Sequence, residues 1–133
     1  MFQNCESFDN LDLSSFNSKN VNNMSYMLNQ CKNIKYLNLS SLDTKNVTNM
    51  KTMFQNCESL DNFDLSSFNT QNVNDMSYMF NNCKNIKYLN LSSFDAKNVT
   101  DFSYMFIFCA NLDYIDLSIF KTKKAINLSF IFF

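Results

Sequence analysis

The five cysteines of this 133-residue chain follow one another at identical intervals. They are Cys5, Cys31, Cys57, Cys83 and Cys109. Cutting the chain at this interval gives five copies without a gap, at residues 1–26, 27–52, 53–78, 79–104 and 105–130. A fixed period of about 20–50 residues is typical of a solenoid or a related repeat array. We therefore expect residues 1–133 to form a single solenoid of five repeats, and we expect it to be a fragment of a longer array.

The copies alternate between two types, and positions within a copy are numbered here as columns 1 to 26. Copies 1 and 3 are identical in 21 of 26 columns, and copies 2 and 4 in 18 of 26, so the duplicated unit is a pair of copies. Column 6 alternates in charge, as Glu6, Lys32, Glu58 and Lys84. Equivalent residues of paired strands lie about 4.8 Å apart, where like charges would repel. The alternation therefore predicts that the copies stack in register.

Each copy contains a short stretch typical of a strand. In Leu37-Asn38-Leu39-Ser40 apolar and polar residues alternate, which predicts a half-buried strand with its leucines inside and Tyr36, Asn38 and Ser40 outside. Leu42 and Val47 are expected to return to the core through an Asn-rich bend. Asn tolerates a left-handed backbone, so we expect it to replace glycine there.

A second apolar pattern follows the bend. Its members are separated by three or four residues, which predicts a short helix capped by Thr48 or Asn49. In copies 2 and 3 these residues are Met50, Met53, Phe54, Cys57 and Leu60. The expected fold class is therefore α/β, with one short parallel strand and one short helix in each 26-residue turn.

The composition removes many functional classes. The chain has no Gly, Pro, His or Trp, and its 11 cationic residues are all Lys. These absences exclude glycine-rich phosphate loops, histidine-based nucleophile systems, histidine-ligated zinc and arginine clamps. The net charge of −1 makes nucleic acid a poor partner. No apolar run reaches the length of about 18 residues that a membrane span needs. We expect neither an enzyme nor a cofactor or metal site, and we find no signal peptide in these residues.

The repeat as a whole resembles a known family. The pattern MFxxCxxLxxLDLSSFxTxNVxxMSYMF, with the L-x-x-L-x-L core at 34–39 and 86–91, is similar to the 26-residue bacterial-surface-protein repeat of the BspA-like leucine-rich repeats. The resemblance covers residues 1–130 and implies a curved parallel solenoid that is secreted or lies on a cell surface, with adhesion or host binding as its role and no catalytic residues. Copy 5 departs from the pattern at Phe108, Ile119 and Ala125.

The outward strand positions are the candidate binding site. Tyrosine offers a rigid amphipathic contact that suits protein or glycan ligands, and the serines of column 14 extend the same polar face. The candidate residues are Tyr36, Tyr88, Tyr114, Asp12, Asn38, Asp64, Asn90 and Asp116. The alternative is a structural spacer with a solvated sheet and no ligand. A remote alternative is a glycosidase that uses Asp12 and Asp64.

Two further expectations concern the cysteines and the C-terminal end. Parallel side chains in stacked turns oppose disulfide formation, so we expect five reduced, buried thiols. The Met and Phe columns are expected to form the core. Copy 5 carries Ile107, Phe108, Ile119 and Ile126, and the tail 130–133 is wholly apolar. This end either caps the core or joins another chain, and we expect self-association.

Overall fold

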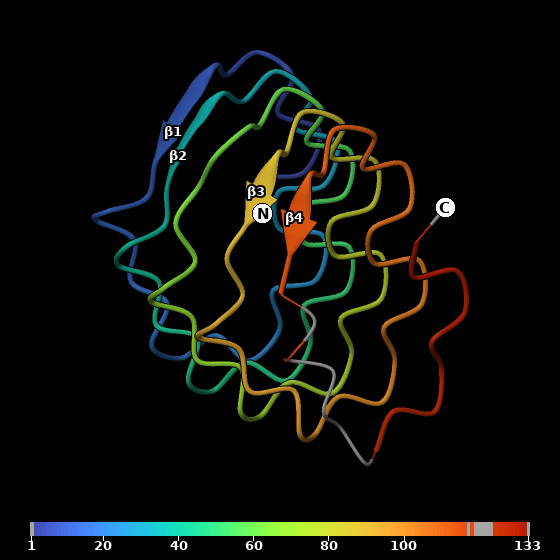
Figure 1. Cartoon of the computed structure of the whole chain (residues 1–133). Coiled ribbons are helices and arrows are strands. Elements are labelled where there is room, and N and C mark those ends of the chain that lie inside the picture. The colour runs from blue at the N-terminus through green and yellow to red at the C-terminus, as the bar shows by residue number, and fades with distance from the viewer. Residues whose placement is uncertain (1, 117, 119–123, 133) are drawn as a thin grey trace.

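Successive copies of the repeat lie side by side in the computed structural model, which describes residues 2–116, 118 and 124–132 (Figure 1). The strands are β1 (Asn10–Asp12), β2 (Tyr36–Asn38), β3 (Tyr88–Leu89) and β4 (Tyr114–Ile115). β1 pairs with β2, and β3 with β4, both in parallel and with partners that occupy the same column of neighbouring copies. The predicted register is confirmed at these two pairs.

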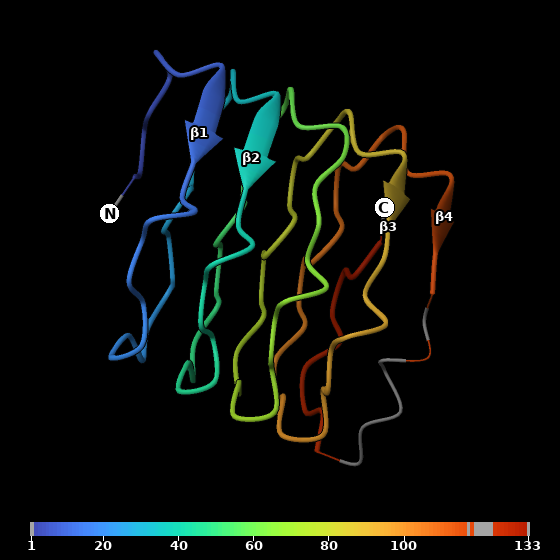
Figure 2. The same cartoon turned by 90° about the vertical axis from the view of Figure 1, so that its left-hand side faces the viewer.

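The rest of this compact chain is mostly irregular, with almost no helix in its described part. A second line of parallel contacts joins the copies at column 23. It consists of isolated bridges between Asn23, Asn49, Asp75, Asp101 and Asn127, each to the next. Copy 3 passes between β2 and β3 without a strand of its own (Figure 2), so the sheet is divided into two pairs.

The predicted helix is wrong. The backbone N–H groups of Met50, Thr52 and Phe54 donate to carbonyls of the next copy, at 2.9–3.0 Å, instead of to their own segment. The N–H groups of Met53 and Gln55 close four-residue turns onto the carbonyls of Met50 and Thr52, both at 3.2 Å. Consecutive turns place every third or fourth side chain on the inside, so they produce the same apolar spacing as a helix.

The expected helix caps have other partners. The Thr48 hydroxyl donates to the carbonyl of Asn22 in the preceding copy, at 3.2 Å. Oδ1 of Asn49 accepts from the backbone N–H of Lys51 at 2.9 Å, which closes an Asx turn. Both side chains therefore stabilise turns and contacts between copies.

Left-handed backbone occurs at two columns. Such a φ at the third residue of a turn is the conformation that normally favours Gly or Asn. Column 4 has φ of 58–65° and column 26 has φ of 53–60°. The column 4 residues are Asn4, Gln30, Asn56, Asn82 and Phe108. Asparagine thus replaces glycine in column 4. The prediction that it does so in the bend after the strand is wrong, because no residue of 43–47 or 69–73 has a positive φ. Asp43 and Asn69 instead form Asx turns there with the N–H groups of Lys45 and Gln71.

One continuous core runs through the copies. Leu37, Leu39, Leu42 and Val47 are buried as predicted. The Met and Phe columns are buried in the middle copies, whereas Phe2 is half-buried and Phe132 is exposed at the two ends. Aromatic rings stack along column 2, with centroid distances of 5.6 Å from Phe54 to Phe80, 5.7 Å from Phe80 to Phe106 and 5.4 Å from Phe106 to Phe132. This stack connects copies 3, 4 and 5 and the tail.

Polar side chains also connect neighbouring copies. The column 3 amides form a ladder in which Gln3 donates to Asn29, Asn29 to Gln55 and Gln55 to Asn81, at 3.0–3.3 Å. The ladder ends at Ile107, whose carbonyl accepts from Asn81.

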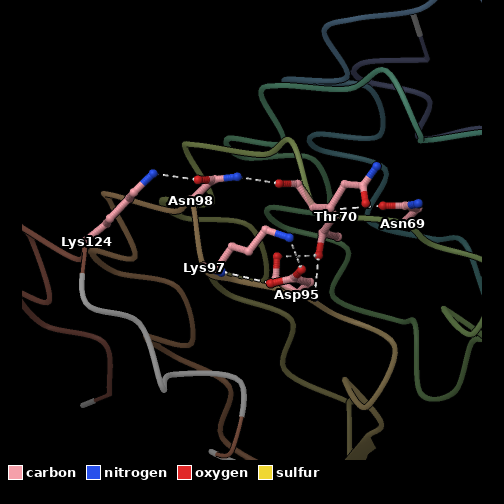
Figure 3. Close-up of polar contacts among 7 residues, drawn as sticks. Asn69, Thr70, Asp95, Lys97, Asn98 and Lys124 are labelled. Atoms are coloured by element: carbon pink, nitrogen blue, oxygen red, sulfur yellow. Dashed lines mark hydrogen bonds and ion pairs between the residues drawn. The ribbon is translucent and has the colours of Figure 1, made fainter.

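A second set of polar contacts lies along the bend. The Thr70 hydroxyl donates to the carbonyl of Asp95 at 3.1 Å, and Lys124 donates to Oδ1 of Asn98 at 2.7 Å (Figure 3). These groups satisfy one another across copies, so the stack is stabilised by hydrogen bonds as well as by its core.

All five thiols are free, as predicted, and Cys31, Cys57 and Cys83 are buried. Cys5 and Cys109, in the two outermost copies, are only half-buried, because no further copy covers that side of them. Each thiol from Cys31 onward donates to the carbonyl of the column 2 residue in the preceding copy, at 2.9–3.3 Å. Burial raises the pKa of Cys31 and of Cys109 to about 11 and that of Cys57 and Cys83 still further.

The tail partly covers the C-terminal end. The carbonyls of Asn127 and Ser129 accept from Phe102 and Tyr104 of copy 4, both at 3.0 Å. The carbonyl of Ile131, in the tail, accepts from the N–H of Phe106 in copy 5 at 2.9 Å. Beside it, a hollow of about 250 Å³ remains open over Leu112, Ile115 and Phe132. Ile126 is 87% exposed. Ile119 lies outside the described residues.

Candidate binding face

The three predicted tyrosines project from the strands. Tyr36 starts β2, Tyr88 starts β3 and Tyr114 starts β4. Their exposed fractions are 57%, 54% and 58%, because the strand alternation turns column 10 outward while column 11 packs inside. Tyr88 and Tyr114 stack with ring centroids 5.8 Å apart and an interplanar angle of 11°. The rings form an exposed aromatic row.

The Asp and Asn residues of column 12 have a structural function that the sequence analysis missed. In each copy Oδ1 of this residue accepts a hydrogen bond from the backbone N–H of the column 14 serine, at 2.8–3.1 Å. This Asx turn ends the strand. One oxygen is thus engaged in the fold, and the remaining amide or carboxylate atoms of Asp12, Asn38, Asp64, Asn90 and Asp116 are held in fixed orientations.

A groove of about 490 Å³ lies across the middle of this face. Tyr36, Asn38 and Ser40 of copy 2 lie on one side of it and Tyr88 and Asn90 of copy 4 on the other. Its remaining lining residues are Leu37, Leu39, Asn62, Phe63 and Asp64. Five of the eight predicted site residues thus line one groove.

The groove coincides with the gap in the sheet. No backbone hydrogen bond joins 62–64 to β2 or β3 within the described part of the chain. Tyr114, Asp12 and Asp116 lie on the same face but do not line the groove. Sequence analysis missed Asn62 and Phe63; the signal for Phe63 is an aromatic residue in column 11, where the other copies have Leu or Ile.

A second hollow of about 450 Å³ is lined by the residues immediately before the groove. Its charged lining residues are Lys35, Asp61 and Lys87, with Ser59 and Asn85 beside them. The charges alternate from copy to copy, so the carboxylate partly neutralises the two ammonium groups. This hollow carries a small positive charge.

The electrostatics of the acidic residues oppose the glycosidase alternative. The backbone N–H of Ser14 lowers the pKa of Asp12, and that of Ser66 lowers the pKa of Asp64. A glycosidase's general acid needs a raised pKa, usually from an apolar environment. Neither carboxyl therefore has the properties of that acid.

Among the described residues no group of His, Cys, Asp or Glu has the arrangement of a metal site, and no helix there is long and apolar enough to cross a membrane.

A family model described as "Mycoplasma protein of unknown function, DUF285" matches residues 1–89 and again residues 62–133. The chain belongs to the DUF285 family. DUF285 is a repeat-like family related to bacterial surface proteins with leucine-rich repeats, so the resemblance seen in the sequence is confirmed at this level. No curated protein and no solved structure matches this DUF285 chain.

Proposed function

We propose that this DUF285 chain is a leucine-rich-repeat-like solenoid of BspA type that serves as a non-enzymatic binding module of a cell-surface protein. Its ligand is a protein or a glycan held on the tyrosine face, in adhesion or host interaction. The observation that carries the proposal is the row of three tyrosine rings, each more than half exposed. Tyrosine concentrates binding energy because its large ring loses little conformational entropy.

The polar part of the face supports the same function. The Asx turns hold the column 12 side chains in place before any ligand arrives, and preorganised groups lose less entropy on binding. One observation favours the structural spacer instead: the same oxygens are already used by the fold. A spacer needs the turns but not the exposed tyrosines.

Binding assays on the tyrosine face separate the two functions. The chain and its triple variant Tyr36→Ala, Tyr88→Ala, Tyr114→Ala are tested against panels of extracellular-matrix proteins and of immobilised glycans. We expect binding by the parent chain and a loss of at least about tenfold in the variant. The control is Tyr26→Asn, which removes a 43%-exposed ring from a site with φ of 59°. Binding by neither protein would favour the spacer. Equal binding by both would contradict a ligand site on the tyrosine face.

Surface labelling tests the location. Antibodies against the chain should bind intact cells that carry the whole protein. Labelling only after permeabilisation would contradict the surface assignment.

A further inference from the structure

Phe63 distinguishes copy 3 from copy 1, although the two copies are identical in 21 of 26 columns. Copy 1 has Leu11 at this column and forms β1, whereas residues 62–64 form no strand. The Phe63 ring packs 5.0 Å from Phe54 and 6.1 Å from Phe80, measured between centroids. Because a larger side chain in a packed core displaces the backbone, we infer that this ring keeps 62–64 from pairing with β2 and β3.

The opened sheet changes what the face offers. Tyr36 and Tyr88 flank the groove, and the shorter Asn62 lies between them in column 10. Amide side chains both donate and accept hydrogen bonds, as sugar hydroxyls do. Among the described residues, the groove lining contains one charged side chain, Asp64, and no cation. Its volume of about 490 Å³ lies within the range of about 300–1,000 Å³ for ligand sites.

We propose that the groove between Tyr36 and Tyr88 binds a neutral oligosaccharide, an inference that rests on the function proposed above and specifies its ligand. The tyrosine rings pack against the apolar faces of sugar rings, and Asn38, Asn62 and Asn90 bind the hydroxyl groups. Asp64 accepts hydroxyl hydrogen bonds and repels anionic sugars. A sugar fits this lining better than an apolar protein segment does, because Asn38, Ser40, Asn62, Asp64 and Asn90 offer hydrogen-bonding groups beside the two tyrosine rings.

The test is an array of neutral oligosaccharides with glucose, galactose and N-acetylhexosamine linkages, together with sialylated and sulfated ones. Calorimetry with the neutral compounds retained on the array then gives affinities. We expect neutral oligosaccharides to bind, and we expect Tyr36→Ala and Tyr88→Ala each to weaken binding at least tenfold, or about 1.4 kcal/mol. Tyr26→Asn, outside the groove, should bind as the parent chain does.

Phe63→Leu tests the origin of the groove. It restores the leucine that copies 1, 2 and 4 have in column 11. Residues 62–64 should then pair with β2 and β3 and close the groove. The thermal midpoint should not fall, and the affinity for sugar should drop at least about tenfold. Unchanged affinity in this variant would contradict the proposed opening.

The array also separates this inference from the proposed function. Binding of matrix proteins alone, lost in the triple tyrosine variant, would overturn the sugar ligand but retain the binding module. Binding of sialylated or sulfated glycans alone would contradict the proposal that the oligosaccharide ligand is neutral. Binding of nothing would overturn both proposals.

Discussion

Nζ of Lys84 lies 2.7 Å from Oε2 of Glu58, which occupies the same column of the preceding copy. Lys32 and Glu6 form the equivalent pair between copies 1 and 2, at 3.2 Å. The charge alternation seen in the sequence thus becomes contact between neighbouring copies. Such exposed pairs contribute only about 0–1 kcal/mol, so their main effect is to disfavour other registers.

Reversing this alternation in column 12 should destabilise the stack. β1 and β2 pair Asp12 with Asn38, so Asn38→Asp places two carboxylates side by side while retaining the Asx turn. Asp64 is not expected to add a third carboxylate to this row, because copy 3 is not paired with β2. We expect a lower urea midpoint at low salt, and a smaller loss at high salt. Ser40→Asp is the charge-matched control, and an equal effect of both variants would contradict column-specific pairing.

Acid should remove part of the stability that Asp12 and Asp64 provide. Their folded-state pKa values lie below the ordinary 3.8, so this stability is present above pH 4 and lost as the pH falls through the folded values. The double variant Asp12→Asn, Asp64→Asn retains both acceptors but does not titrate. We expect the stability difference between the two proteins to shrink from pH 4 to pH 2 in denaturant titrations. A difference that is independent of pH would contradict the pKa shifts.

The side-chain oxygen of Asp75 should matter more than its charge. Oδ1 accepts from the N–H of Ser77 at 2.9 Å and from its hydroxyl at 2.7 Å. Asp75→Ala should lower the free energy of unfolding by about 0.5–1.5 kcal/mol. Asp75→Asn keeps the acceptor and relieves repulsion from the bridged Asp101, so it should be neutral or stabilising. Equal losses in the two variants would mean that the Asx turn contributes nothing.

The thiols should react in an order set by burial. Because burial keeps Cys31, Cys57 and Cys83 protonated, they should react with a thiol reagent at pH 8 more slowly than the half-buried Cys5. Five thiols should titrate after denaturation without reductant. A smaller number would reveal a disulfide that the stack of parallel side chains does not allow.

The open C-terminal end should self-associate. The hollow over Leu112 and Ile115 and the exposed Ile126 leave apolar surface there that the tail does not cover, and such surface favours association. Light scattering should show a mass that rises at tens of micromolar and falls on Ile126→Lys or deletion of residues 130–133. A chain that stays monomeric with and without the tail would favour the cap.

The sequence predicts the repeat, the register and the inward leucines because these depend on periodicity, which every copy repeats. It does not distinguish a helix from consecutive turns, since both place Met50, Met53 and Phe54 inside. The gap at copy 3 is also hidden, because Leu and Phe fit the apolar column 11 equally well and the sequence pattern does not register their difference in size. Asn38 and its equivalents form Asx turns because the strand ends at their column. The alternation of apolar and polar residues fixes the end of a strand only to within a residue or two.

The central claim is that each sequence column becomes a row of neighbours on the folded chain, since the tyrosine face depends on it. Nuclear Overhauser contacts measure this most directly. We expect backbone contacts between Leu11 and Leu37 and between Asn49 and Asp75, and side-chain contacts between Tyr88 and Tyr114. Residues 50–57 should lack the consecutive amide contacts of a helix. Helical contacts there, without contacts between equivalent columns of neighbouring copies, would contradict the account.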